Sequence, residues 1–434
     1  MTPTLIGTLG IVILVLLFLA RVPVAFAMGI MGLVGFSYLT SVSAGLEMIA
    51  IDMFQVFSSY NLTVVPMFVL MGCIAFRIGM SSRIFDASYI VLGNMRGGLT
   101  IASILGSAAF SAICGSTNAT AAAMGTVALP QMKRYKYDDS LATGAVASAG
   151  TLGILIPPSA LLIIYGIITE QSIGKLFVAG VLPGLLLAFA FIATVFIMCS
   201  RNPALGPSGP ATTFREKLKT FPAIIEVLVI FMMVLGGLMT GWFSATQAGG
   251  AGAGIVALIG LIRRELTWKN LVEAAQDTLL ITCMVMFVIF GATLFGRFMA
   301  VTQIPFILSK WIGGLPLPPV IIMIFIVLIH LVGGCFMDGL AMIMLTVPIL
   351  FPTVLALGFD PIWFGVIITL IVEMGAITPP VGINVYVVKG IAPDVPLQTI
   401  FKGIFPFLYA LVIVTVILII FPQIATYLPG FVVF

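Results

Sequence analysis

Charged residues are scarce in this sequence of 434 residues. They make up 8% of the chain, against about 25% in an average soluble domain. Hydrophobic residues make up 61%, which exceeds what a soluble core needs. The net charge of +4 is too small and too scattered to indicate a nucleic-acid partner. The sequence therefore predicts a protein that a lipid bilayer surrounds along most of its length.

Groups for enzymatic chemistry are also few. A single histidine, His330, excludes the paired histidines of a zinc protease, and no G-x-x-x-x-G-K-[ST] nucleotide-binding motif is present. The five cysteines lie in apolar runs without C-x-x-C spacing, so we expect them to be buried. We expect no enzyme and no organic cofactor, and we expect His330 to be packed or hydrogen-bonded.

Apolar runs predict ten membrane spans in two sets of five. A polar segment rich in proline and glycine, 201–220, separates the sets and is expected to be a cytoplasmic linker. The predicted spans are 4–20, 22–39, 62–79, 140–170 and 176–199, and then 222–240, 246–262, 278–298, 360–389 and 398–422.

Within each set, an amphipathic stretch follows the third span, at 81–97 and at 301–317. Two short apolar pieces come next, interrupted by small residues. Pieces too short to cross the membrane twice predict a re-entrant helical hairpin, at about 98–130 and again at about 318–352.

The two halves of the sequence match each other. Arg77 aligns with Arg297, and Pro157-Pro158 aligns with Pro379-Pro380. Five crossings per half is an odd number, so the second half must be inverted relative to the first. We therefore predict an all-α membrane protein with two inverted repeats, residues 1–200 and 221–434.

The distribution of the 19 lysines and arginines supports this topology. If the N-terminus lies outside, the external loops receive only Lys175, Arg297 and Lys310, and the remaining basic residues lie inside. Both termini are then predicted on the outer side of the membrane.

The first predicted hairpin turns at Gly115-Ser-Thr-Asn118, a polar run in apolar surroundings. Its free carbonyls suit a cation, and the helix that starts there suits an anion. We predict Ser116, Thr117 and Asn118 as substrate ligands and Ser116 and Asn118 as Na⁺ ligands. The alternative is a capped turn at a helix break.

Each Pro-Pro pair lies in the middle of an apolar run, in Gly150–Ser159 and in Gly375–Asn384. Paired prolines should unwind the helix and start a second half-helix near Ser159 and near Gly382. The alternative is a structural kink. Predicted Na⁺ ligands are the carbonyls of Gly153, Ile156, Pro158, Gly375, Thr378 and Val381, and predicted substrate ligands are Ser159, Thr378 and Asn384.

Two carboxylates fall within apolar stretches, where ionisable groups are functional candidates. Asp338, at the second hairpin tip near Gly334, is expected either to bind Na⁺ with Gly334 or to cap the returning helix. Glu373 is expected to position the second break, and proton coupling through either acid stays open. Arg77 and Arg297 are expected to reach the membrane interface, with substrate contact as the alternative.

Together these residues resemble the large membrane subunit of the tripartite ATP-independent periplasmic (TRAP) transporters, which carry C4-dicarboxylates, sialic acids and related acids. The resemblance covers essentially the whole chain. The motifs that carry it are Arg21-Val-Pro-Val-Ala-Phe-Ala27, Gly115-Ser-Thr-Asn-Ala-Thr120, Ile156-Pro-Pro-Ser159, Leu176-Phe-Val-Ala-Gly180 and Glu373-Met-Gly-Ala-Ile-Thr-Pro-Pro-Val-Gly-Ile-Asn384.

The resemblance implies uptake of a small organic anion, a carboxylate or sulfonate, across a bacterial inner membrane with both termini periplasmic. It implies a Na⁺ gradient and an elevator motion, and we expect two Na⁺ sites, one where the first tip meets the loop 153–158 and one where the second tip meets the loop 375–381. It also implies a separate small four-helix membrane subunit and a periplasmic binding protein as partners. The alternatives are a stand-alone Na⁺/dicarboxylate symporter and a channel.

Overall fold

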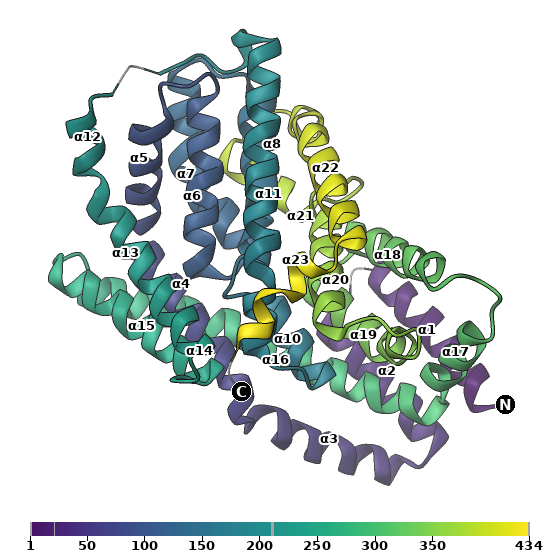
Figure 1. Cartoon of the computed structure of the whole chain (residues 1–434). Coiled ribbons are helices and arrows are strands. Elements are labelled where there is room, and N and C mark those ends of the chain that lie inside the picture. Colours follow the sequence, from purple (N-terminus) through teal and green to yellow (C-terminus); the bar gives the residue numbers. More distant parts are fainter. Residues whose placement is uncertain (1, 21, 210–211, 433–434) are drawn as a thin grey trace.

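The computed structural model describes residues 2–20, 22–209 and 212–432. Within these ranges the chain is helical and has no strand (Figure 1). This confirms the all-α class. The residues outside these ranges are Met1, Arg21, 210–211 and 433–434, so the start of the motif at Arg21 and part of the predicted linker lie outside the described residues.

The helices of the first half follow the predicted spans closely. They are α1 (Pro3–Leu19), α2 (Val24–Leu39), α3 (Val42–Phe57), η1 (Tyr60–Thr63), α4 (Val64–Arg77), α5 (Met80–Leu92), α6 (Gly98–Cys114), α7 (Thr117–Arg134), α8 (Asp139–Gly150), α9 (Leu152–Leu155), α10 (Ala160–Thr169) and α11 (Ile173–Arg201).

The second half begins after a short helix in the linker. Its elements are η2 (Pro203–Leu205), α12 (Phe214–Lys219), α13 (Phe221–Phe231), η3 (Met232–Gly236), α14 (Gly237–Met239), α15 (Ala245–Ile262), α16 (Trp268–Thr302), α17 (Ile304–Gly313), α18 (Pro319–Phe336), α19 (Gly339–Ala356), α20 (Pro361–Ile377), α21 (Ile383–Ile391), α22 (Leu397–Ile420), α23 (Gln423–Thr426) and η4 (Leu428–Phe431).

Among the described residues, nine helical stretches are long and apolar enough to cross a membrane. They include both arms of the second hairpin, α18 and α19, at 18 residues each. Each of these 18-residue helices extends about 27 Å, so the length of the arms does not decide whether the hairpin crosses the membrane or re-enters it. Re-entry of this hairpin, like the inverted repeat, stays a prediction.

Two further differences concern helices with charged residues. Helix α3 was not predicted, and it buries a single stripe, Gly45, Met48, Asp52 and Val56, at helical spacing. Helix α16 begins ten residues before the predicted span, which starts at 278. The prediction missed the first turns of this helix because they carry charged residues, and hydropathy identifies only apolar runs.

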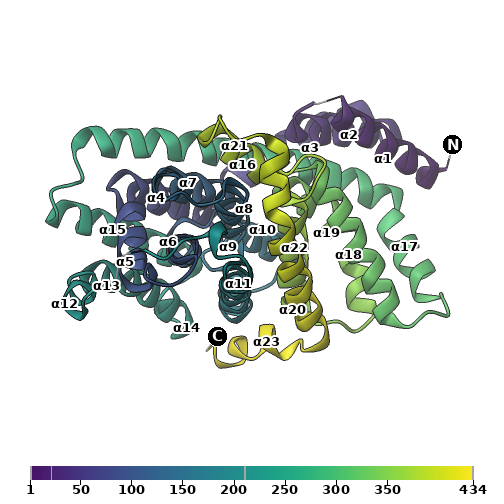
Figure 2. The same ribbon diagram turned by 90° about the horizontal axis from the view of Figure 1, so that it is seen from above.

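Helices from opposite halves pack together in pairs. Helix α2 lies along α16, and α4 lies along α15 (Figure 2). Small residues permit the first contact: a Cβ on Gly32 would come within 2.5 Å of the Leu294 carbonyl carbon. We call α1–α4 with α13–α16 the scaffold group.

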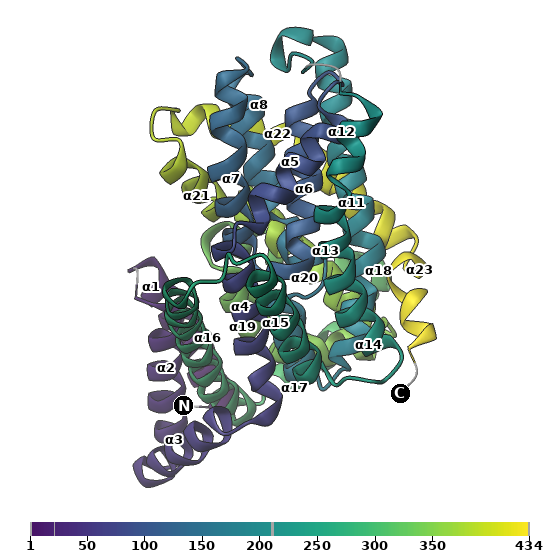
Figure 3. The ribbon, with the colours of Figure 1, turned by 90° about the vertical axis from the view of Figure 1, so that its left-hand side faces the viewer.

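The hairpins, the broken helices, α11 and α22 form a second set of contacts, which we call the hairpin group. Here α8 packs on α22, α18 packs on α20, and α11 contacts both α20 and α22. Helix α5 leads from the scaffold group into the first hairpin, with α12 and α13 beside it (Figure 3).

His330 joins the two arms of the second hairpin. It is buried, with Nδ1 2.8 Å from the carbonyl oxygen of Ile326 and Nε2 2.9 Å from the hydroxyl of Thr346 on α19. The expectation of a hydrogen-bonded histidine is confirmed.

Candidate functional site

A cleft lies where both hairpin tips approach both broken helices. Its cavity volume is about 130 Å³, and it is partly open to the outside. All of its polar side chains come from the hairpin group, whereas α4 and α16 contribute only Val65, Phe68, Val69, Ile281, Met284 and Val285. A polar surface thus faces an apolar scaffold wall.

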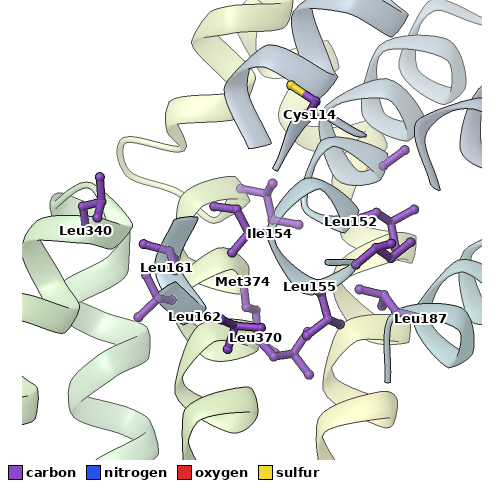
Figure 4. Packing of buried hydrophobic residues seen from close by; sticks show 14 of the residues in the cluster. Cys114, Leu152, Ile154, Leu155, Leu161, Leu162, Leu187, Leu340, Leu370 and Met374 are labelled. Atoms are coloured by element: carbon purple, nitrogen blue, oxygen red, sulfur yellow. The ribbon is translucent and has the colours of Figure 1, made fainter. Parts of the chain in front are cut away.

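Both broken helices end where the Pro-Pro pairs predicted. Helix α9 ends at Leu155 and α10 begins at Ala160 with Ser159 as its N-cap. Helix α20 ends at Ile377, and α21 begins after Gly382. The predicted half-helix starts are confirmed. Apolar side chains surround the first break, with Leu340 of α19 and Met374 of α20 nearby (Figure 4).

The first hairpin tip rests on the first break. Gly115 has a φ of +65°, and a Cβ there would lie 2.7 Å from the carbonyl oxygen of Pro158. The backbone N–H of Ala160 donates to the carbonyl oxygen of Gly115 at 3.4 Å. Glycine is therefore required here both for its conformation and for the close approach.

A small cradle of oxygen atoms lies behind this tip. A Cβ on Gly153 would come within 2.6 Å of the Ser116 carbonyl oxygen and within 2.8 Å of the Thr120 hydroxyl. Thr120 is fully buried, and its hydroxyl has no hydrogen-bond partner within the described part of the chain. Thr120 was not predicted as a site residue, although it lies on α7 one helical turn after the N-cap Ser116.

Side chains cap three of the helices that begin at the cleft. Ser159 accepts from Leu162 N at 3.2 Å, and Asp338 accepts from Leu340 N at 3.1 Å. Ser116 accepts from Ala119 N at 3.5 Å. The capping role that the sequence left open for Asp338 is thus present, and it leaves further carboxylate oxygen capacity free.

The second tip meets the second break through backbone contact. A Cβ on Gly375 would lie 2.5 Å from the carbonyl carbon of Gly334. Thr378 is the C-cap of α20, and its hydroxyl donates to the Met374 carbonyl oxygen at 2.6 Å. Pro379 and Pro380 are exposed, whereas Pro157 and Pro158 are buried, so the two breaks differ in accessibility.

Glu373 lies between the two tips. It is 4% exposed, and its Oε2 accepts from the hydroxyl of Thr117 at 2.8 Å. The predicted positioning role of Glu373 therefore has a specific partner in Thr117, which was not predicted. Asn384 is buried, and its Nδ2 donates to the Ala147 carbonyl oxygen at 3.4 Å, which joins α21 to α8.

The structure brings about half of the predicted site residues into one cleft. Those that line it are Ser116, Thr117, Asn118, Pro158, Ser159, Asp338 and Asn384. Those outside its lining are Gly153, Ile156, Gly334, Gly375, Thr378 and Val381. The second group lies in or against the helix breaks; Ile156, for example, packs on Gly184 of α11.

Arg77 and Arg297 form ion pairs instead of reaching freely into the interface. Arg77 contacts Glu273 and Asp277 of α16, and Arg297 contacts Asp52. Neither arginine lines the cleft. Their contacts are structural, between scaffold helices.

Comparison with known proteins gives a consistent result. The sequence model of the family described as "Tripartite ATP-independent periplasmic transporter, DctM component" matches residues 11–424. The C4-dicarboxylate TRAP transporter large permease protein DctM of Pseudomonas aeruginosa is 35% identical over 383 residues, covering 88% of this chain and 89% of the relative.

Other relatives carry different substrate names. The sialic acid TRAP transporter large permease protein SiaM of Vibrio cholerae is 32% identical and covers 99% of this chain and 98% of its own. The isethionate TRAP transporter permease protein DctMQ of Oleidesulfovibrio alaskensis is 31% identical, covering 94% of this chain and 64% of the relative. These names confirm a transporter, not an enzyme.

Among solved structures, the YdaH transporter of Alcanivorax borkumensis matches with a TM-score of 0.60 and 14% identity. The match covers 96% of this chain and 97% of that one. At this identity the match shows a shared membrane-protein fold.

Proposed function

The chain belongs to the DctM component family of the tripartite ATP-independent periplasmic transporters, and we propose that it imports a small organic anion, a carboxylate or sulfonate, driven by a Na⁺ gradient. The observation that carries this proposal is the cleft at which both hairpin tips meet both broken helices. The helices α7, α10, α19 and α21 all begin at its lining. Helix N-termini carry partial positive charge and free N–H groups, which favour an anion.

The side chains available to the anion are neutral donors on the cleft lining: Asn118, Ser159 and Asn384. Asn118 is exposed to the cleft, and Ser159 and Asn384 are buried at its edge. Such groups recognise an acid without selecting one carbon skeleton. The relatives named for C4-dicarboxylate, sialic acid and isethionate are consistent with this breadth.

Charge balance favours coupling to a cation. Asp338 and Glu373 both line the cleft, so an incoming anion meets acidic groups there and no basic side chain on the cleft lining. Removing that anion from water without a compensating charge is strongly unfavourable. Bound cations between the tips and the breaks would supply the compensation.

The first proposed Na⁺ site is the cradle formed by the Ser116 carbonyl, the Thr120 hydroxyl and the backbone at Gly153. Its ligands are neutral oxygens, which suit Na⁺ but do not take up a proton near neutral pH. The carbonyls of Ile156 and Pro158 and the side chain of Asn118 lie on the same tip and break.

The second proposed Na⁺ site lies where Gly334 contacts Gly375, with the carboxylate of Asp338 nearby on the tip. Carbonyls at Thr378 and Val381 in the second break complete the proposed ligand set. Both proposed sites therefore join one hairpin tip to one broken helix.

We propose that the hairpin group moves as a unit against the scaffold group. The scaffold wall of the cleft is entirely apolar, so polar contacts need not break as the two surfaces slide. A second cavity shares Ser116 and Ile281 with the cleft and extends to Asp277. In the predicted orientation this cavity leads to the cytoplasm.

The proposed assembly follows from the family. A small four-helix membrane subunit and a periplasmic substrate-binding protein would complete a tripartite system in the bacterial inner membrane, with both termini of this chain periplasmic. The main alternative is a Na⁺/dicarboxylate-type symporter that works without a binding protein.

Uptake into proteoliposomes tests the proposal. The chain and its small membrane subunit would be reconstituted and offered labelled succinate, sialic acid or isethionate, with and without a Na⁺ gradient and the binding protein. We expect uptake that needs both. Uptake with Na⁺ alone would favour the stand-alone symporter, and uptake that ignores the gradient would contradict Na⁺ coupling.

The two-site assignment has its own test. Asn118→Ala at the first site and Asp338→Asn at the second site are each expected to raise the Na⁺ concentration needed for half-maximal uptake. Unchanged Na⁺ dependence in both variants would rule out the assignment.

A further inference from the structure

The two halves of the chain contribute unequally to the charge of the cleft. At the shift that aligns the two Pro-Pro pairs, Asp338 falls on Ser116 and Glu373 falls on Thr151. Ser116 and Asp338 are both N-caps of the returning hairpin helices. Both carboxylates therefore belong to the second half, and the first half has hydroxyl groups at the matching positions.

One hydrogen bond connects the first tip to the acidic side chain of Glu373. The hydroxyl of Thr117, the first residue of α7, donates to Glu373 Oε2 at 2.8 Å. Both residues are 4% exposed, so water competes little for the bond. A hydrogen bond shielded from water in this way is stronger than the same bond in solvent.

The same carboxylate lies against the second tip. A Cβ on Gly339, the first residue of α19, would be 3.6 Å from Glu373 Oε1. Glu373 itself lies on α20, one turn before the second break. A single side chain thus contacts both hairpin tips and shares a helix with the second proposed cation site.

This arrangement makes the position of one tip depend on the other. Thr117 directly follows Ser116, whose carbonyl belongs to the first proposed site, so a cation there fixes Thr117. A fixed Thr117 holds the Glu373 carboxylate in one orientation beside Gly339. If the hydroxyl withdraws, a buried carboxyl oxygen loses its donor, which is costly.

We propose that the Thr117–Glu373 hydrogen bond couples the two cation sites, so that Na⁺ bound at either one raises the affinity of the other. Glu373 and Thr117 act here as positioning residues. The inference rests on the proposed Na⁺ coupling and adds that the two Na⁺ ions bind cooperatively. Thr117 was predicted as a substrate ligand, but its hydroxyl hydrogen is donated to Glu373 in this structure.

Equilibrium binding of ²²Na⁺ to the full-length chain in lipid nanodiscs tests this without knowledge of the substrate. The unchanged protein is expected to show a sigmoidal binding curve. Thr117→Val keeps the side-chain shape but removes the donor, so we expect a hyperbolic curve and a half-saturating Na⁺ concentration raised about tenfold. Thr117→Ser restores a hydroxyl and is expected to restore the sigmoidal curve.

A matched control lies on the same helix as Glu373. Thr369 is fully buried, and its hydroxyl has no hydrogen-bond partner among the described residues. Thr369→Val makes the same chemical change away from the cleft and is expected to leave the curve unchanged. A hyperbolic curve for both valine variants would indicate a general packing effect and overturn the proposal.

The outcomes separate this inference from the proposed function. If the unchanged protein binds no Na⁺, Na⁺ coupling itself is wrong. If it binds Na⁺ and Thr117→Val has the same sigmoidal curve, only the coupling bond is wrong. If Thr117→Val does not fold, two variants of Glu373 replace it. Glu373→Gln keeps an acceptor oxygen, so its binding curve is expected to stay sigmoidal, whereas the curve of Glu373→Met is expected to lose cooperativity. Equal curves for these two variants would contradict the proposal.

Discussion

Arg297 near the end of α16 donates to the buried carboxylate of Asp52 on α3 at 3.1 Å. Asp52 is 2% exposed at its side chain and Arg297 is 54% exposed. The matching residue Arg77 likewise pairs with acids, at 2.5 Å from Asp277. Two arginines that align between the halves therefore both fasten neighbouring scaffold helices.

The burial of Asp52 predicts an unequal response to mutation. Arg297→Gln leaves a buried carboxylate unpaired and is expected to destabilise the protein by about 1–3 kcal/mol, a range reduced for the exposure of the arginine. Asp52→Asn removes the buried charge and should cost less. Thermal unfolding in detergent measures both, with exposed Lys310→Gln as control; equal losses would contradict this account.

A close crossing of α8 and α22 predicts intolerance to a single methyl group. A Cβ on Gly403 would overlap the carbonyl oxygen of Ser140 and approach Gly144. Gly403→Ala should cost at least about 1–3 kcal/mol by overpacking. Thermal midpoints measure the effect, and Gly390→Ala, whose Cβ would have no atom within 4 Å, should be neutral. Equal midpoints for both variants would refute the close crossing.

The cradle behind the first tip predicts a role for Thr120 in Na⁺ dependence. Thr120→Val removes one oxygen ligand without changing shape, so the Na⁺ concentration for half-maximal uptake should rise about tenfold. Thr353→Val removes another buried hydroxyl without a partner among the described residues, on α19 outside the cleft lining, and should leave Na⁺ dependence unchanged. A similar shift in both variants would argue against the cradle.

A surface ion pair predicts a window of pH dependence. Lys133, at the base of the first hairpin, donates to Asp394, which follows α21. The hydrogen bond from Lys133 lowers the pKa of Asp394 and raises the pKa of Lys133. The stabilisation should be present above the usual aspartate pKa of about 3.9 and disappear as the pH falls through the lower folded value. At the alkaline end it should disappear as the pH rises through the raised pKa of Lys133.

Comparison with Asp394→Asn measures this window. The variant should have a slightly lower thermal midpoint than the unchanged protein at neutral pH, and the two should converge in strong acid. The difference is expected to be small because both side chains are exposed. A difference that grows on acidification would contradict the assignment.

Local chemistry was enough to predict the breaks. Proline lacks an N–H and disfavours helix in the residue before it, so the ends at Leu155 and Ile377 follow from the sequence alone. The same holds for Ser159 as an N-cap, because a hydroxyl there satisfies a free N–H.

The remaining site contacts depend on tertiary packing. Glu373 and Thr117 are 256 residues apart, and nothing local to either identifies the other. Helix α3 escaped prediction because hydropathy cannot recognise a helix that buries one stripe only. Thr378 was placed in the cleft by its motif, but its hydroxyl bonds back into its own helix.

The pairing of α2 with α16 and of α4 with α15 also governs how the protein is made. While the ribosome is still synthesising the second half, α2 and α4 are already inserted but lack the helices on which they pack. The close contact between Gly32 and Leu294 can form only after more than half of the chain has entered the membrane. Assembly of the scaffold group is therefore a late step of biosynthesis, and neither half can complete this group on its own.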